Sequence, residues 1–119
     1  MSHIERAAEL RGEGCNCAQA VLGAFCGDFG LDADTAKLLT AGFGNGLGDG
    51  YGACGALLGG IMVLGLRHGH NRARAKAEIM AFKEAFREKT GELACYKLRR
   101  GGTPCGELVA LAVRLLEES

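Results

Sequence analysis

Residues 53–66 read ACGALLGGIMVLGL and form the longest apolar run of the chain. A membrane-spanning helix needs about 20 apolar residues, so this run instead predicts a buried helix, which we expect over residues 53–70. Gly55 and Gly59 lie four residues apart in it and therefore share one face of the helix. A face of such small residues lets a second helix pack closely. The run thus predicts a helical core built around this segment.

The stretch just before it is the most unusual in composition. Residues 42–52 read GFGNGLGDGYG, with glycine at every second position. Glycine reaches positive φ values freely and loses much conformational entropy when it is ordered. The pattern therefore predicts either a mobile loop or a backbone that must pass close to another group.

Capping signals predict helices on both sides of this stretch. Asn16 followed by Gln19 is a capping-box pattern, which predicts a helix over Cys17–Cys26 that ends at Gly27. Thr103 and Pro104 are the expected N-cap and first residue of the last helix. The other expected helices run from Ser2 to near Gly12, from Asp32 or Asp34 to Gly42, and from Asn71 to Thr90.

Four of the expected helices carry apolar residues that are the candidate core, and those within residues 71–90 lie at helical spacing on one face. The candidate core residues are Val21, Leu22, Phe25, Ala36, Leu38, Leu39, Ala41, Ile79, Phe82, Phe86, Leu108, Leu111, Ala112 and Leu115. Because no long strand pattern is visible, the predicted fold is all-α: a small bundle of four to five helices with a Gly-rich loop before the fourth. Residues 1–119 are predicted to form a single domain.

Composition and charge exclude several classes of function. The chain has 119 residues, of which 48% are apolar and 24% charged, and its net charge is zero. A nucleic-acid-binding domain is usually basic, so we expect no nucleic-acid partner. The first residues do not form a signal peptide, so we expect a cytoplasmic protein without membrane insertion. The glycine-lined face at residues 53–66 also favours a homodimer.

Six cysteines stand out in a chain expected to lie in a reducing compartment, where metal binding or thiol chemistry is commoner than structural disulfides. No C-x-x-C pair is present, which excludes a thioredoxin-type motif, paired zinc knuckles and c-type haem attachment. Four cysteines lie at or near predicted helix N-termini, where exposed N–H groups stabilise thiolates. These are Cys17, Cys54, Cys95 and Cys105.

If these N-termini converge, the four thiols suit an iron–sulfur or zinc site, or equally a set of reactive, low-pKa thiols that form disulfides. Cys26 lies at the far end of its helix and is expected to be a core residue, and Cys15 a spare thiol. His68 lies about 20 Å along the helix from Cys54 and cannot join such a site. Residues 95–98 are expected to form a short turn.

Three blocks of sequence carry a family resemblance. Residues 16–21 read NCAQAV, residues 54–59 match C-G-A-x-x-G, and Phe82, Gly91, Cys95 and Cys105 follow in order. Together they resemble the C-GCAxxG-C-C family of redox-active proteins over about residues 12–110. That family is similar to the cluster-bearing part of split-Soret cytochromes. The resemblance implies an iron–sulfur site held by Cys17, Cys54, Cys95 and Cys105.

Gly50, Gly52 and Gly55 match the pattern G-x-G-x-x-G. A dinucleotide-binding site requires a preceding strand, and none is predicted here. Two interpretations remain: the glycines bring the backbone close to a cofactor beside Cys54, or they form a tight structural turn.

The sequence therefore predicts a small redox protein in which four cysteines bind an iron–sulfur cluster, such as [2Fe–2S], and exchange electrons with a redox partner protein. The alternatives are a metal-free thiol–disulfide protein and a structural four-cysteine zinc protein.

Overall fold

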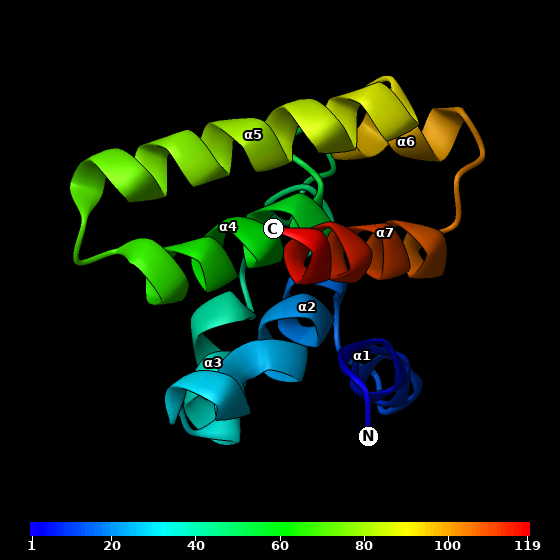
Figure 1. Cartoon of the computed structure of the whole chain (residues 1–119). Helices are drawn as coiled ribbons and strands as arrows, with labels where there is room; N and C mark the ends of the chain where they lie inside the picture. The colour runs from blue at the N-terminus through cyan, green and yellow to red at the C-terminus, as the bar shows by residue number, and fades with distance from the viewer.

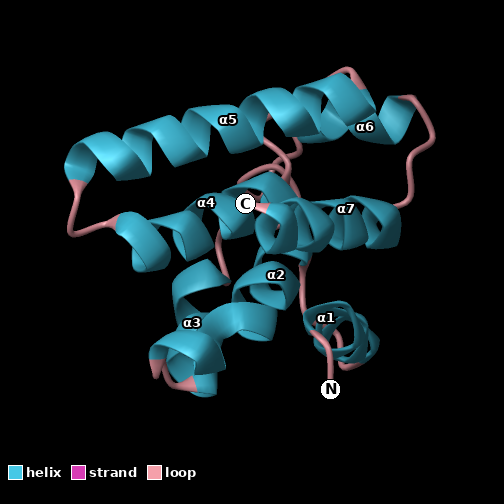
Figure 2. Cartoon of the chain, in the orientation of Figure 1, coloured by secondary structure: helices cyan, strands magenta, loops and turns pink.

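The computed structural model describes residues 1–119, and the chain is helical with no strand (Figures 1 and 2). Ala53 and Ala94 pair in one isolated antiparallel bridge. The helices are α1 (His3–Gly12), α2 (Cys17–Phe25), the 3₁₀ helix η1 (Cys26–Phe29), α3 (Ala33–Thr40), α4 (Gly55–His68), α5 (Arg72–Thr90), α6 (Cys95–Arg100) and α7 (Cys105–Glu118). None of these helices is both long and apolar enough to cross a bilayer.

The apolar helix α4 lies at the centre of the molecule and packs against α2, α5 and α7. In Figure 1, α5 and α6 lie above α4 and α7, while α1, α2 and α3 lie below them. The largest fully buried side chains include Leu57, Leu64, Leu22, Phe86 and Leu116, which come from α4, α2, α5 and α7. The run at residues 53–66 is therefore the middle of the core, as predicted.

The small-residue face of α4 explains how closely its neighbours approach. A Cβ atom added at Gly59 would lie 2.9 Å from the Ala18 carbonyl oxygen of α2. A Cβ atom added at Gly60 would lie 2.3 Å from the Phe82 ring of α5. Helices on two sides of α4 thus occupy the space that side chains would need, which confirms the prediction of close helix packing.

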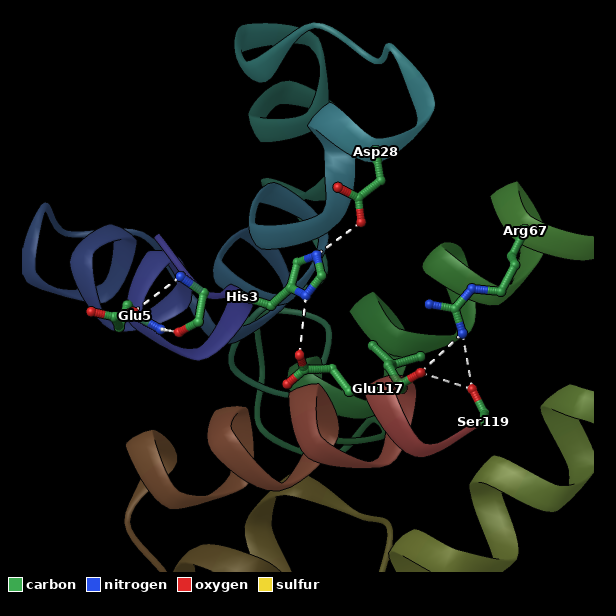
Figure 3. Close-up of polar contacts among 8 residues, drawn as sticks. His3, Glu5, Asp28, Arg67, Glu117 and Ser119 are labelled. Atoms are coloured by element: carbon green, nitrogen blue, oxygen red, sulfur yellow. Dashed lines mark hydrogen bonds and ion pairs between the residues drawn. The ribbon is translucent and has the colours of Figure 1, made fainter.

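The predicted caps form as hydrogen bonds. Asn16 accepts from the Gln19 N–H (2.8 Å) while the Gln19 side chain accepts from the Asn16 N–H (2.9 Å). Ser2 and Glu5 make the same reciprocal pair at the start of α1 (Figure 3). Asn71 caps α5, which ends at Gly91 with φ of 81°. Local capping chemistry therefore sets these helix boundaries.

The structure has seven α-helices, so the prediction of four to five is wrong. The segment expected to be a turn at residues 95–98 is the helix α6, which buries Leu98. The short helix α1 is also a full part of the bundle and buries Ala7 and Leu10. Helices this short are marginal in isolation, so contacts with the rest of the core stabilise them, and a local sequence pattern does not reveal those contacts.

Several finer predictions also need correction. Residues 26–29 continue past Gly27 as a 3₁₀ helix that ends at Gly30, where φ is 70°. The last helix begins one residue later than expected, with Pro104 as its N-cap. In α3, Leu38 and Leu39 are 78% and 56% exposed, although they were expected in the core.

In α7, the face that packs on the core is rotated relative to the prediction. Leu108 and Ala112 are buried as expected, but Leu111 and Leu115 are only half-buried. The remaining fully buried residues are Val109, Val113 and Leu116. Because α7 meets α1, α2, α4 and α5, its core face is wider than a single apolar stripe.

Long-range polar contacts tie the two termini to the bundle (Figure 3). His3 lies between Asp28 (2.8 Å) and Glu117 (3.3 Å) and stacks on the Phe25 ring. Arg67 donates to the Leu116 carbonyl oxygen at 3.0 Å. The contacts of His3 thus connect the start of α1 with η1 and with the end of α7.

Candidate functional site

Four cysteines lie at the starts of four different helices. Cys17 is the first residue of α2, Cys54 is the N-cap of α4, Cys95 is the first residue of α6, and Cys105 is the first residue of α7. All six cysteines of the chain are free thiols. The helix-terminus positions predicted from the sequence are therefore present, and the remaining question is whether the four side chains meet.

Paired backbone segments bring Cys54 and Cys95 together. The Cys54 N–H donates to the Leu93 carbonyl at 2.7 Å, and the Cys95 N–H donates to the Gly52 carbonyl at 2.9 Å. These bonds flank the Ala53–Ala94 bridge. Two segments about forty residues apart in sequence thus run side by side and deliver one cysteine each.

Close backbone contacts place Cys17 next to the same segment. A Cβ atom at Gly55 would lie 3.3 Å from the Cys17 Cβ and 2.9 Å from the Phe43 carbonyl oxygen. The Asn16 amide donates to the carbonyls of Thr40 and Ala41 at 3.4 and 3.2 Å, which holds the start of α2 against the end of α3. The cysteine that follows this cap is thereby fixed against the start of α4.

The pKa of Cys17 reports its surroundings. Burial of the thiol raises its pKa to about 12, and negative charge on Cys105 or Cys54 would raise it further, while Arg11 acts in the opposite direction. A side-chain interaction with Cys105 acts in the same direction as burial. The surroundings of Cys17 therefore favour its protonated form, and Cys105 and Cys54 contribute to those surroundings.

The pKa of Cys54 is also raised, first by burial of the thiol. The backbone N–H groups of Leu57 and Ala56 in the first turn of α4 oppose this, although the sulfur makes no regular capping hydrogen bond. Negative charge on Cys95 or Cys105 would raise the pKa of Cys54 as well. Each of the four thiols is therefore electrostatically linked to at least one other, and we call this set the cysteine cluster: Cys17, Cys54, Cys95 and Cys105.

These directions correct one expectation. The sequence suggested low-pKa thiols, because helix N-termini stabilise a thiolate. In the structure, burial outweighs the helix N-terminus at Cys17 and Cys54, so their pKa values move up. Thiols with raised pKa values keep their protons until a metal cation displaces them or until oxidation to a disulfide releases them.

The cluster lies just below the surface. Cys17, Cys54 and Cys95 are buried and Cys105 is half-buried, so α7 provides the most accessible thiol. Cys26 is buried apart from the cluster and its thiol donates to the Gly23 carbonyl at 3.3 Å, as expected of a core residue. Cys15 is buried too, and its carbonyl accepts from Arg11 at 3.1 Å.

The three glycines of the G-x-G-x-x-G pattern lie along the edge of the cluster. The carbonyl of Gly50 accepts from the Tyr96 N–H at 2.9 Å, and that of Gly52 accepts from Cys95. Gly50 has φ of 86°, and Gly55 has no room for a side chain. Helix and turn residues precede them, with no strand, so the pattern is not part of a dinucleotide-binding unit. Gly50 and Gly52 thus lie in the contact between residues 50–54 and 93–96, whereas Gly55 lies against Phe43, Ala18 and Cys17.

Gly46 provides a further close approach that the sequence analysis did not single out. A Cβ atom there would lie 2.7 Å from the Cys95 Cβ, and its φ is 56°. The alternating glycines at residues 42–52 indicate that the backbone passes close to another group, but they do not indicate that this group is Cys95.

Two charged residues near the cluster were also missed. Arg11, at the end of α1, lowers the pKa of Cys17. Glu92 accepts from the N–H groups of Leu93 and Ala94 at 2.9 and 3.2 Å, immediately before Cys95. The sequence signals neither residue, because acidic residues mark a helix start at its N-cap or in its first turn, and Glu92 precedes both.

The chemistry of the donor set is uniform. Four thiols and no imidazole or carboxylate make up the cluster, and such donors favour zinc and iron–sulfur clusters. No group of three or more His, Cys, Asp or Glu side chains has the arrangement of a metal-ion site in this structure. His68 lies at the other end of α4 from Cys54, as predicted.

Comparison with known families gives one match. The family described as "Putative redox-active protein (C_GCAxxG_C_C)" matches residues 15–119. No curated protein and no solved structure matched the chain.

Proposed function

The chain belongs to this redox-active family, and from that premise we propose that it is an electron-transfer protein whose cysteine cluster binds an iron–sulfur cluster. The observation that supports the proposal is that four cysteines stand at four separate helix starts, and that backbone contacts bring the segments of Cys17, Cys54 and Cys95 side by side. A [2Fe–2S] cluster divides four cysteine ligands between two iron atoms and accepts or donates single electrons.

The chain's own residues supply the ligands and their surroundings. Cys17, Cys54, Cys95 and Cys105 would hold the irons, with the first turns of their helices directing N–H groups toward added negative charge. The raised pKa of Cys17 means that loading releases protons, so binding would strengthen as pH rises. The electrons would go to or come from a redox partner protein, and a reducing compartment such as the cytoplasm suits free thiols.

The test begins with anaerobic purification and analysis of iron, acid-labile sulfide and zinc per chain. We expect iron with sulfide and visible absorbance that dithionite bleaches. Zinc at one per chain without iron would instead support a structural zinc site. Metal-free protein that takes up no iron and sulfide on reconstitution would overturn the proposal.

Cysteine variants test the ligand set. Cys17→Ser, Cys54→Ser, Cys95→Ser and Cys105→Ser should each lose most of the bound iron, because each removes one ligand. Cys26→Ser and Cys15→Ser are the matched controls, since both thiols are buried outside the cluster, and they should keep it. Full iron retention in the first four variants would refute the assignment.

A second function is favoured by the free thiols of Cys17 and Cys105, which start two helices that pack together, α2 and α7, and which interact electrostatically. These two thiols could react with a disulfide partner by exchange, forming one intramolecular disulfide while the partner becomes a dithiol, so that two electrons and two protons leave the protein. Mass spectrometry of metal-free protein treated with oxidised glutathione would locate the bond. A Cys17–Cys105 disulfide that a reductant reverses would support this role, and random pairing would count against it.

A further inference from the structure

The helix α6 carries a basic and aromatic surface directly beside the cysteine cluster. Lys97, Arg99 and Arg100 are exposed on this helix, which contains no acidic residue. Tyr96 follows Cys95 in the chain, and the ring of Tyr51, which is 74% exposed, lies tilted against it with ring centroids 5.5 Å apart. We call these five residues the α6 patch: Tyr51, Tyr96, Lys97, Arg99 and Arg100.

The cations and the aromatic rings form one surface. The Lys97 ammonium and the Arg100 guanidinium both lie 5.9 Å from the centroid of the Tyr96 ring. Such contacts keep long cationic side chains close to an aromatic group. Tyrosine and arginine are enriched at protein interfaces, where they contribute much of the binding energy.

Backbone hydrogen bonds fix the patch to the cysteine cluster. The Tyr96 N–H donates to the Gly50 carbonyl at 2.9 Å, beside the bond from Cys95 to Gly52. Tyr51 and Tyr96 therefore come from the same paired segments that deliver Cys54 and Cys95. A protein docked here would lie next to the site at which electrons enter or leave.

Charge favours an acidic partner. The chain as a whole is neutral, so this concentration of positive charge is local. Glu92 lies 3.5 Å from Lys97 and is the one acidic group paired with the patch cations, which leaves Arg99 and Arg100 for a partner. Complementary charge steers association and sets orientation more than it raises affinity.

We infer that the α6 patch is the docking surface for an acidic one-electron redox protein, which would be oxidised as an iron–sulfur cluster held by the cysteine cluster is reduced, or the reverse. The role of this docking surface rests on the proposed electron-transfer function, but binding of the partner does not require a bound iron–sulfur cluster.

The experiment measures binding of a purified acidic ferredoxin to the full chain, reduced and metal-free, by calorimetry at low and at physiological ionic strength. We expect binding that weakens as salt increases. Reversal of the patch by Lys97→Glu, Arg99→Glu and Arg100→Glu should weaken it by about tenfold or more. Neutralisation of the same residues to Gln should give a smaller loss in the same direction and guards against misfolding of α6.

A matched control lies at the far end of α5. Arg72, Arg74 and Lys76 are three exposed cations of which one, Arg74, pairs with a carboxylate at 3.3 Å, just as Lys97 does in the patch. Reversing this control set to Glu should change the affinity less than about twofold.

Three results would overturn the inference: no binding at low ionic strength, equal loss in both triple variants, or binding of a single-stranded oligonucleotide in place of the ferredoxin. Because ferredoxin binding is measured with the metal-free chain, its result does not depend on whether the chain takes up iron. A chain that binds the ferredoxin through the α6 patch but takes up no iron would retain the docking surface and lose the proposed cofactor.

Discussion

At the scale of single residues, the glycines of α4 decide how close the cysteines can come. An alanine at Gly55 would place its Cβ 2.9 Å from the Phe43 carbonyl oxygen and 3.3 Å from the Cys17 Cβ. A backbone oxygen cannot move away as a side-chain tip can. The space at Gly55 is therefore a requirement of the cluster as well as of the helix packing.

We predict that Gly55→Ala destabilises the protein by about 1–3 kcal/mol, because overpacking outweighs the gain in helix propensity. Gly65→Ala in the same helix is the control, since a Cβ atom there meets nothing within 4 Å. That change should stabilise the protein by up to about 1 kcal/mol. Urea denaturation of both variants measures the difference. Equal effects in the two variants would contradict the packing argument.

At the scale of the elements, the cap of α2 has two separate functions. The Asn16 side-chain oxygen accepts from Gln19, while its amide nitrogen donates to Thr40 and Ala41 of the neighbouring segment. One residue thus caps the start of α2 and connects that start to the end of α3. The two functions can be separated by substitution.

We predict that Asn16→Ala costs about 1–2 kcal/mol of stability, because both the cap and the contact with α3 are lost. Asn16→Asp keeps an accepting oxygen at the cap but removes the amide donor, so its loss should be smaller. Thermal unfolding of the two variants gives the comparison. If Asp proved as destabilising as Ala, the cap would contribute nothing at this position.

Glu92 gives the segment before α6 a dependence on pH. The N–H groups of Leu93 and Ala94, and then Lys97, lower the pKa of this carboxyl below 4.5 in the folded chain. A carboxyl with a lowered folded-state pKa stabilises the fold above its unfolded pKa, and this contribution disappears as pH falls through the folded value.

We therefore predict that Glu92→Gln lowers stability at pH 7, and that the difference from the parent protein shrinks as pH falls through the lowered folded-state pKa of Glu92. Urea denaturation at several pH values tests this. Glu88→Gln, at an exposed position of α5, is the control for a general change of charge. A difference between Glu92→Gln and the parent that stayed constant down to acid pH would show that the carboxylate has no such role.

At the scale of the whole molecule, the sequence predicted local features well and long-range ones poorly. The caps at Asn16 and Asn71 and the close packing at Gly59 depend on neighbouring residues or a helical period, and they formed as predicted. The helix α6 and the exposure of Leu38 depend on contacts with distant segments, which no local pattern encodes.

The cysteine cluster illustrates both cases. Helix starts at Cys17 and Cys105 were predictable to within one residue from the caps that precede them. The electrostatic interaction of these two cysteines was not predictable, because it needs α2 and α7 to pack against each other. The rise in the pKa of Cys17 follows from that same burial and so also lay beyond the sequence.

The arrangement of the cluster in the whole chain leads to a last prediction. Its four cysteines lie at the starts of α2, α4, α6 and α7, so a bound cofactor would connect four helices from distant parts of the sequence. Binding to the folded state alone stabilises that state, and the gain is greatest where the apo protein opens locally.

When the protein is loaded with iron and sulfide, hydrogen exchange should therefore slow in segments 42–54 and 91–104. Exchange in α1 and α3 should change little, because neither helix contains a cysteine of the cluster. The comparison uses the same preparation before and after reconstitution, followed by mass spectrometry of its peptides. Cys54→Ser, taken through the same reconstitution, provides the control and should show no added protection. Protection spread evenly over all helices would mean that the cofactor stabilises the fold as a whole, and protection confined to α1 or α3 would place it away from the cysteine cluster.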